Sequence, residues 1–157
     1  MEKAERSPYC QCLYFSANAL ARSMTRLAEE AFAPTGLNPS HAFVLMTVAS
    51  NPGVHPGEIA QKMQLTASTV TRLVEALERR SLLARVPGGR EVDVRLTKEG
   101  NRLAEAARTA WRQLYLRYAE LLGEEPAKQI TAQAYAAHEI LSGIDNGQKI
   151  KPRGKLK

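Results

Sequence analysis

The sequence predicts a mainly α-helical fold with one small β-hairpin, and three observations support this class. Apolar residues recur at spacings of three and four on both sides of the middle of the chain, which is typical of amphipathic helices. Between them, residues 56–100 combine two helical patterns with an alternating pattern interrupted by glycines. The chain has 157 residues, of which 44% are hydrophobic, so it can form one domain with extensions.

The first helix is predicted over residues 9–33. Its apolar face combines side chains at helical spacing: Leu13, Ala17, Leu20, Met24, Leu27 and Ala31. Pro34 and Gly36 end this helix, and the run Asn38-Pro39-Ser40 begins a short, largely buried helix. That second helix ends at Asn51-Pro52-Gly53, where proline and glycine favour a turn.

Two further helices are predicted in the middle of the chain. Pro56 suits the first turn of the shorter helix, because its missing N–H is not needed there. Thr66 is expected to cap the longer helix, with its hydroxyl accepting a backbone N–H. The buried side of that helix is given by apolar residues at i, i+3, i+4 and i+7: Val70, Leu73, Val74 and Leu77.

The opposite side of the longer helix carries short polar side chains and a guanidinium near its N-terminus: Ser68, Thr69, Thr71 and Arg72. A helix in the major groove needs this combination, because small side chains allow close approach and arginine can bind guanine or a phosphate. The N-terminal amides of the helix can also meet a phosphate. Serine and threonine are common at helix starts, so each residue singly fits that role too. The set favours DNA recognition.

A β-hairpin is predicted directly after this helix. Pro87-Gly88-Gly89 gives the freedom that a tight turn needs, and the return strand alternates Val92, Val94 and Leu96 with Glu91, Asp93 and Arg95. Arg90 lies at the tip, where it can enter a minor groove or remain a solvated turn residue. Residues 38–97 therefore predict a winged helix-turn-helix, with double-stranded DNA as the leading ligand.

Long helices are also predicted after the hairpin, over residues 101–145. Thr97 is a plausible N-cap, and Gly123 with Pro126 separates the two helices. The apolar stripes of residues 9–33 and 101–145 exceed what one small winged domain can cover. We therefore expect these helices to form a two-fold homodimer, the alternative being packing within one chain.

The net charge of +6 is distributed unevenly. Residues 62–102 carry nine basic and five acidic side chains, as a phosphate-binding surface requires. Residues 146–157 add five basic side chains and no acidic one, and this polar tail is expected to be disordered. The sequence contains no run long enough to span a membrane and no signal-peptide pattern, which predicts a cytoplasmic protein.

The run STVTRLVEALERRSLLAR, followed by a glycine-tipped hairpin and RLTKEG, resembles the MarR family of bacterial transcriptional regulators. The likeness covers nearly the whole chain, from the first helix to about Ser142. It implies a homodimer that binds a palindromic operator, usually as a repressor, and releases it when a small molecule or oxidant acts. By position, Ser68, Thr69, Thr71 and Arg72 match the recognition helix, and Arg90 matches the wing-tip arginine.

One departure from the family pattern lies at the tip of the hairpin. Many members carry Asp-Arg-Arg where this chain has Gly88-Gly89-Arg90. The aspartate that would brace the arginine is therefore absent. The orientation of Arg90 must depend on something else.

Two groups of residues are candidates for a regulatory signal. Peroxide-sensing members of the family hold a reactive cysteine near the start of the first helix, and Cys10 and Cys12 lie there. On a helix they would point away from each other, so ordinary core residues are favoured over a disulfide or a metal site. Three aromatic residues could line an effector cleft between the dimerising and DNA-reading parts, or simply pack in the core: Trp111, Tyr115 and Tyr118.

Other classes of protein fit the sequence less well. It contains no nucleophile elbow, P-loop, dinucleotide-binding loop or zinc-protease motif, which predicts that the protein is not an enzyme. The three histidines are scattered, so we expect neither a metal nor another cofactor. The remaining alternative is a winged helix that contacts proteins without binding DNA, but such a module would favour apolar or acidic residues on the helix face that here carries Ser68 and Arg72.

Overall fold

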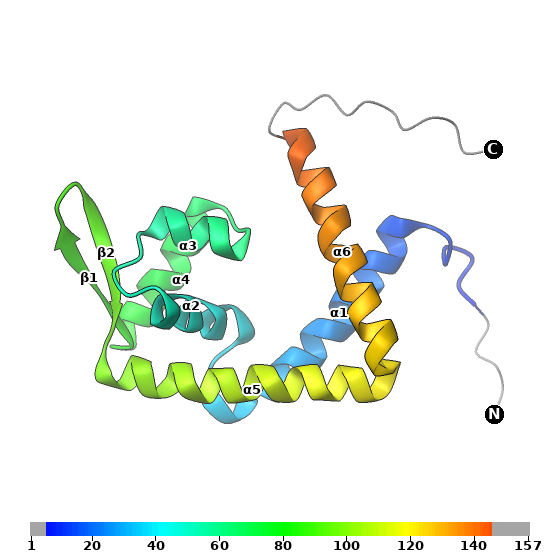
Figure 1. The fold of residues 1–157 in the computed structure, drawn as a ribbon, viewed down its shortest axis with the longest axis horizontal. Coiled ribbons are helices and arrows are strands. Elements are labelled where there is room, and N and C mark those ends of the chain that lie inside the picture. Colours follow the sequence, from blue (N-terminus) through cyan, green and yellow to red (C-terminus); the bar gives the residue numbers. More distant parts are fainter. Residues whose placement is uncertain (1–5, 146–157) are drawn as a thin grey trace. The chain divides into compact units, whose positions relative to one another are not determined.

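The computed structural model describes residues 6–145, most of which are helical (Figure 1). In chain order the elements are α1 (Leu13–Phe32), a 3-10 turn (Ala33–Thr35), α2 (Pro39–Ser50), α3 (Pro56–Met63), α4 (Ala67–Arg79), β1 (Leu83–Gly88), β2 (Glu91–Leu96), α5 (Lys98–Leu122) and α6 (Glu124–Asp145). This order confirms the predicted mainly α fold with a β-hairpin wing and flanking helices. The tail over residues 146–157, expected to be disordered, lies outside the described residues.

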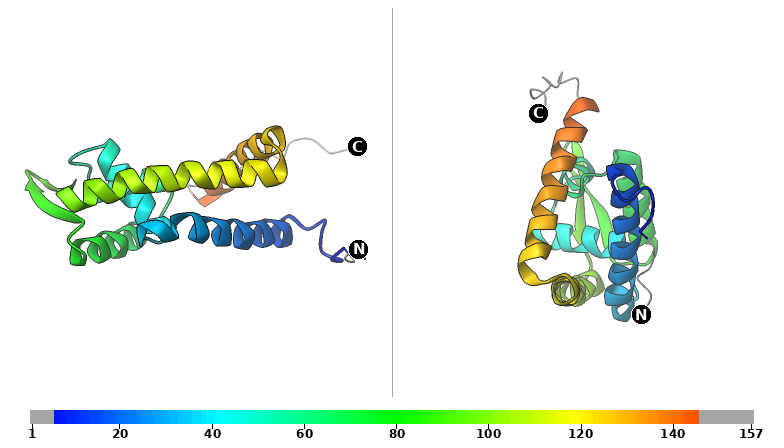
Figure 2. Two further views of the ribbon diagram at one scale, coloured as in Figure 1. Left: turned by 90° about the horizontal axis from the view of Figure 1, so that it is seen from below. Right: turned by 90° about the vertical axis from the view of Figure 1, so that its right-hand side faces the viewer.

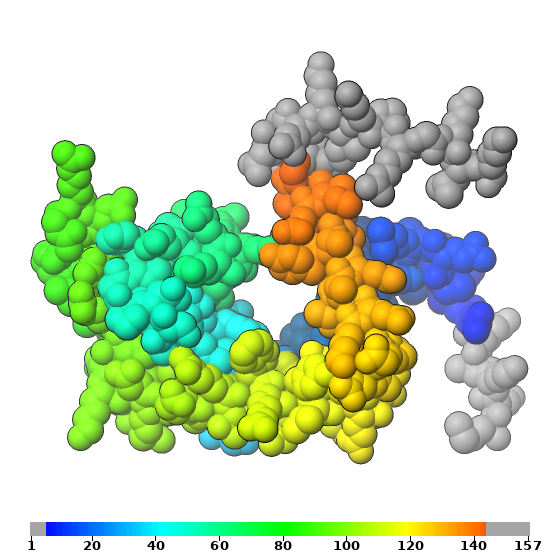
Figure 3. Space-filling model, in the orientation of Figure 1, coloured from blue at the N-terminus to red at the C-terminus, as the bar shows by residue number. Residues whose placement is uncertain are grey.

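The chain divides into two compact units, with the division between Leu114 and Tyr115 inside α5. The first unit holds α1 to α4, the wing and the first part of α5. The second unit holds the end of α5 together with α6. In the first unit, the hairpin of β1 and β2 extends beyond the helices that support it (Figure 2). It stands out as a narrow projection in the space-filling view (Figure 3).

The hydrophobic core lies in the first unit. Among the described residues, nearly all buried apolar side chains precede Tyr115, and Leu45, Ile59 and Leu77 are fully buried. Each such side chain contributes about 1.5–3 kcal/mol when it leaves water. Helix α2 is buried on several sides, because Ala42, Val44, Leu45, Met46 and Val48 are all inaccessible. It therefore forms the centre against which α3, α4 and β2 pack.

The flanking helices leave much apolar surface uncovered. Exposed large apolar side chains cluster on α1, α5 and α6: Leu13, Tyr14, Leu20, Trp111, Leu116, Leu121, Leu122, Ile130, Tyr135, Ile140 and Leu141. None of the described helices is both long enough and apolar enough to cross a membrane.

The start of α1 differs from the prediction. The helix begins at Leu13 rather than at residue 9, because residues 8–11 form a separate turn. In this turn the N–H of Cys10 donates to the carbonyl of Ser7 (3.1 Å), and the N–H of Cys12 donates to that of Tyr9 (2.9 Å). Both cysteines therefore precede the helix and both are exposed. The expectation that they are helical core residues is wrong.

The tip of the wing also differs from the prediction, because the turn begins two residues later. Gly88 pairs with Glu91, and Pro87 pairs with Val92, so both residues belong to β1. The turn is the two-residue loop Gly89-Arg90, with Gly89 at a φ of +74°. A positive φ at the first central residue is what a type II′ hairpin turn requires of glycine. Arg90 accordingly occupies the second position of the tip.

Candidate nucleic-acid interface

Helix α4 forms where the sequence predicts it, because both its start and its buried face are encoded locally. Thr66 caps the helix: its hydroxyl accepts the N–H of Thr69 at 3.3 Å. Gln64 adopts the left-handed conformation (φ +54°) that turns the chain between α3 and α4. Val70, Val74 and Leu77 are fully buried. This fixes the rotation of α4 about its own axis and turns its polar side outward.

The structure brings the predicted recognition residues together on that outward side. Ser68, Thr71 and Arg72 are exposed, and Thr69 is partly exposed. Some of the hydroxyls already have local partners. The hydroxyl of Thr69 lies 2.9 Å from that of Thr66, and Thr71 donates to the carbonyl of Ala67 at 3.0 Å. Thr71 keeps acceptor capacity because a hydroxyl oxygen has two lone pairs.

The charge on α4 changes along its length. Among residues 6–145, no carboxylate forms an ion pair with Arg72. The acidic side chains of α4 lie further along and face Arg85 of β1. Glu78 Oε2 accepts from Arg85 Nη2 at 2.8 Å and from its Nε at 3.0 Å. This hydrogen-bonded guanidinium holds the pKa of Glu78 below its usual range. The N-terminal half of α4 thus offers the positive, polar surface that DNA requires.

The wing places Arg90 at an exposed position away from the helices. Val94 of β2 anchors the inner part of the hairpin: it is fully buried, and its N–H donates to the carbonyl of Val54 at 3.0 Å. Thr97 at the end of the wing caps α5, as predicted, by accepting the N–H of Gly100 at 3.0 Å. The same hydroxyl lies within hydrogen-bond distance of the carbonyls of Ser81 and Leu82, which ties the two ends of the hairpin together.

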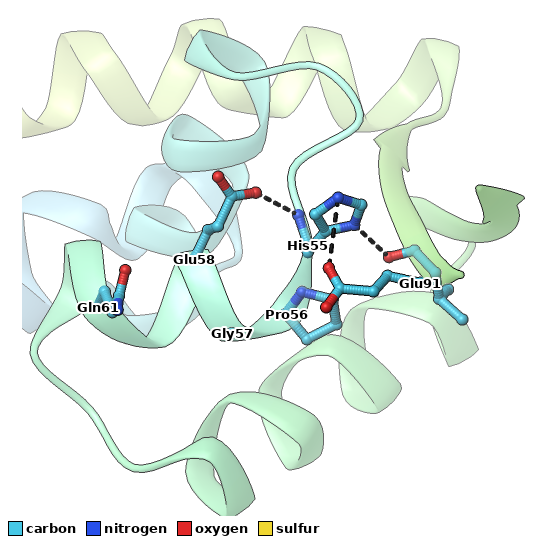
Figure 4. Close-up of a pocket in the computed structure, with 7 residues that line it drawn as sticks. His55, Pro56, Gly57, Glu58, Gln61 and Glu91 are labelled. Carbon is cyan, nitrogen blue, oxygen red and sulfur yellow. Dashed lines mark hydrogen bonds and ion pairs between the residues drawn. The ribbon is translucent and has the colours of Figure 1, made fainter. Parts of the chain in front are cut away.

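A cluster of polar residues connects the wing to the start of α3 (Figure 4). The backbone N–H of His55 donates to Glu58 at 3.0 Å. Its ring Nδ1 lies 3.3 Å from the carbonyl of Val92, and its Nε2 lies 3.5 Å from Glu91. These residues border an open hollow with the following lining: His55, Pro56, Gly57, Glu58, Gln61, Glu91 and Val92. No sequence pattern points to His55, because its contact with Val92 spans 37 residues of the chain.

The three aromatic residues predicted to share an effector cleft are divided in the structure. The ring of Trp111 meets the edge of Phe43 in the first unit, with ring centroids 6.2 Å apart. Tyr115 and Tyr118 belong to the second unit and contact each other at 5.4 Å. They border an open hollow of about 620 Å³ that Tyr135 and Lys128 also line. Glu124, followed by Glu125, raises the pKa of Lys128, so this amine stays charged.

A second hollow lies between α1 and the start of α2. Its lining is entirely different: Met24, Thr25, Ala28, Glu29, Asn38, Pro39, Ser40 and Leu114. Pattern alone could not have found it, because each of these residues also fits an ordinary helix face or helix start. Within residues 6–145, no three histidine, cysteine or acidic side chains are grouped to hold a metal ion.

An exposed polar helix beside an arginine-tipped hairpin is the arrangement found in the winged helix-turn-helix fold. A model described as the MarR family matches residues 35–90, which span α2 to the tip of the wing. Residues 35–90 are therefore similar to the MarR family, as the resemblance in the sequence implies.

Similar proteins span nearly the whole chain. The HTH-type transcriptional repressor MdtR of Bacillus subtilis (strain 168) is 29% identical over 133 residues, covering 81% of this chain and 86% of MdtR. The transcriptional repressor CouR bound to a 23-mer DNA duplex has a TM-score of 0.76 at 20% identity, covering 85% of this chain and 99% of CouR. CouR from Rhodococcus jostii RHA1, bound to p-coumaroyl-CoA, has a TM-score of 0.68 at 23% identity, covering 93% of this chain and 100% of that structure. The likenesses to these structures concern the fold.

Proposed function

We propose that the protein is a transcriptional repressor that binds a palindromic operator as a homodimer and releases it in response to a small molecule or an oxidant. The observation that carries this proposal is the outward polar face at the start of α4. Ser68, Thr69, Thr71 and Arg72 are the proposed readers of the major groove, and Arg90 is the proposed minor-groove contact. The relatives MdtR and CouR are both repressors, which supports the direction of regulation.

The uncovered apolar surface on α5 and α6 supports the homodimer. Leu121, Ile140 and Leu141 are exposed although they are large and apolar. A second copy would bury this surface around a two-fold axis and present two α4 helices to two half-sites. A palindromic operator follows from that symmetry.

The two hollows support a small-molecule signal. CouR binds p-coumaroyl-CoA, a ligand with an aromatic acyl group. Here Tyr115 and Tyr118 offer aromatic surface in one hollow, whereas the other hollow lies between α1 and the start of α2. Trp111, the third predicted residue, is more than half exposed and retains a free ring surface beside Phe43. We therefore propose an aromatic effector, with either hollow as its site.

The exposure of Cys10 and Cys12 favours a second signal, thiol oxidation. A cysteine must be accessible to react with peroxide, and both side chains are exposed just before α1. Oxidation there would alter the start of a flanking helix and, through the proposed dimer, the spacing of the two α4 helices. The remaining alternative, a module for protein contacts alone, is disfavoured by the polar face of α4.

Selection of bound sequences from random duplex DNA tests the proposed function. The expected result is an enriched palindrome whose half-sites are about 10 base pairs apart, centre to centre, or a multiple of this spacing. Repeating the selection with a phenolic acid and with peroxide should reduce recovery in at least one arm. The variant with Cys10→Ser and Cys12→Ser is the control for the peroxide arm. Failure to enrich any sequence would contradict DNA binding.

Sedimentation velocity tests the dimer independently of DNA. Ile140→Glu places a charge in the exposed apolar surface of α6 and should shift the protein towards monomer. Gln133→Glu adds the same charge to an already polar exposed position of that helix and should leave the dimer intact. A wild-type protein that sediments as a monomer at micromolar concentration would contradict the proposal.

A further inference from the structure

We propose that Asp93 is a positioning residue for DNA binding, because its carboxylate holds the wing in the direction in which Arg90 can reach the minor groove. This inference rests on the proposed function. The tip, Gly89-Arg90, contains no acidic residue that could brace the arginine. The direction of Arg90 must therefore be set by the hairpin as a whole.

Apolar support for the hairpin ends halfway along its length. Val94 is 0% exposed and pairs with the buried Val54. Further towards the tip, Val92 is 42% exposed and Val86 is 39% exposed. A two-stranded hairpin without a packed face is marginally stable in water. The outer half of the wing therefore depends on polar contacts to hold its direction.

The polar contacts of β2 in this region involve Asp93 and His55. Its Oδ2 accepts from Arg95 Nη2 at 3.0 Å, and its Oδ1 lies 3.7 Å from His55 Nδ1. His55 also contacts the carbonyl of Val92 and the carboxylate of Glu91 on the same strand. The side chain of Asp93 is only 19% exposed, although it lies on a hairpin that projects into solvent. Since His55 begins α3, these contacts connect the outer strand to the helix-turn-helix itself.

Two glycines leave the space that this carboxylate occupies. A Cβ added at Gly88 would collide with the carboxylate of Asp93, whose Cγ would be 2.7 Å away. A Cβ added at Gly53 would lie 3.3 Å from Asp93 Oδ2 and equally close to Arg95 Nη2. Contacts this short force the neighbouring atoms to move. The sequence analysis explained both glycines as turn residues, but Gly88 lies in β1 and its missing side chain makes room for Asp93.

The first test measures the wing in the free protein. Backbone order parameters of Gly89 and Arg90 should fall from about 0.85 towards about 0.6 in Asp93→Ala, because the outer hairpin loses its brace. Asp93→Asn keeps the shape without the charge and should lie between the two. The thermal unfolding midpoint should change little, since Val94 still anchors the inner half. Unchanged order parameters in Asp93→Ala would overturn the proposal.

The second test asks whether Asp93 acts through Arg90. With the selected operator, Asp93→Ala and Arg90→Ala should each weaken binding by about tenfold, and the double variant should be no weaker than Arg90→Ala alone. Independent effects that multiply to about a hundredfold would assign Asp93 a role separate from Arg90 and overturn the proposal.

Gly88→Ala provides a second route to the same brace. It should weaken DNA binding more in the wild-type background than in Asp93→Ala, where the carboxylate it displaces is gone and only the contact with the backbone carbonyl of Glu91, at 3.0 Å, remains. Gly57→Ala is the matched control, since an added Cβ there meets no atom within 4 Å.

If the wild-type protein selects no DNA, the proposed function fails. The order parameters still decide separately whether Asp93 holds the wing.

Discussion

Helix α4 and the wing are adjacent in the chain and are both proposed to contact DNA, but they are held in different ways. The start of α4 is fixed by its neighbours in sequence: Thr66 caps it, and Val70 and Val74 set its buried face. The wing is fixed by residues far away in the chain, because Val54 and His55 contact β2. A local element tolerates changes elsewhere in the protein, whereas a remotely held element responds to them.

This difference bears on the proposed response to a signal. A signal that moves the loop before α3 would alter the direction of the wing without unfolding α4. Elements that move in regulation are generally drawn from the less stable parts of a fold. The wing, with its exposed outer half, fits that description better than α4 does.

The largest effect is expected at the base of the wing, in Gly100→Ala. Gly100 is buried, and an added Cβ would collide with the backbone carbonyl of Leu82, which cannot turn aside as a flexible side chain can. We expect the free energy of unfolding to fall by about 3 kcal/mol in urea denaturation. Gly57→Ala, in open space within α3, should instead raise it by about 0.5 kcal/mol. Equal stability of Gly100→Ala and the wild type would show that this junction is not held as tightly as the contact implies.

The next largest effects are expected from substituting Arg72 of α4 and Arg90 of the wing, the two arginines proposed to contact DNA. Arg72→Ala should weaken operator binding by about 1–3 kcal/mol and relax the base preference at one position. Arg90→Ala should weaken operator binding less than Arg72→Ala does, and its effect should fall mainly on A·T-rich minor-groove positions. Fluorescence anisotropy at several salt concentrations measures both, with Arg79→Ala further along α4 as the control. If both arginine variants kept the wild-type affinity and salt dependence, the proposed DNA contacts of α4 and the wing would be wrong.

A smaller effect is expected from Thr66→Ala, which removes the cap of α4. The lost hydrogen bond to Thr69 should lower stability by about 1 kcal/mol. Thr109 is the matched control, because its hydroxyl only donates to the carbonyl of Glu105 within α5. Thermal unfolding followed by circular dichroism measures the change. If Thr109→Ala were as destabilising as Thr66→Ala, the local encoding of α4 would be in question.

The smallest effect concerns the contact between α4 and β1. Arg85 depresses the pKa of Glu78 in the folded protein, so this contact stabilises the fold above the unfolded pKa of about 4.3. The contribution is lost as the pH falls through the lower, folded pKa. Stability measured from pH 7 to pH 3 should therefore be less pH-dependent in Glu78→Gln. Glu99→Gln, whose partner Arg102 lies on the same helix, should flatten the curve similarly but leave the wing unaffected. If the stability curve of Glu78→Gln matched that of the wild type, the contact between Glu78 and Arg85 would not contribute to stability.

The parts of the site that the sequence predicted are those held by residues close together in the chain. The cap at Thr66, the buried face of α4 and the cap at Thr97 were predicted, because each depends on residues within four positions of one another. The start of α1 was placed too early, since the turn before Leu13 competes with the helix through its own backbone hydrogen bonds. The aromatic residues could not be assigned to one cleft, because their neighbours lie on other helices.

By itself, the sequence determined the helices, the hairpin and the polar outer face of α4, because helical periodicity, capping and turn chemistry act over a few residues. Only the tertiary structure decided where the wing points. It brought His55 of one loop to Asp93 of a strand, with Gly53 and Gly88 leaving room for the carboxylate. Such contacts leave no periodic pattern in the chain, since they arise only when the core around α2 has brought distant segments together.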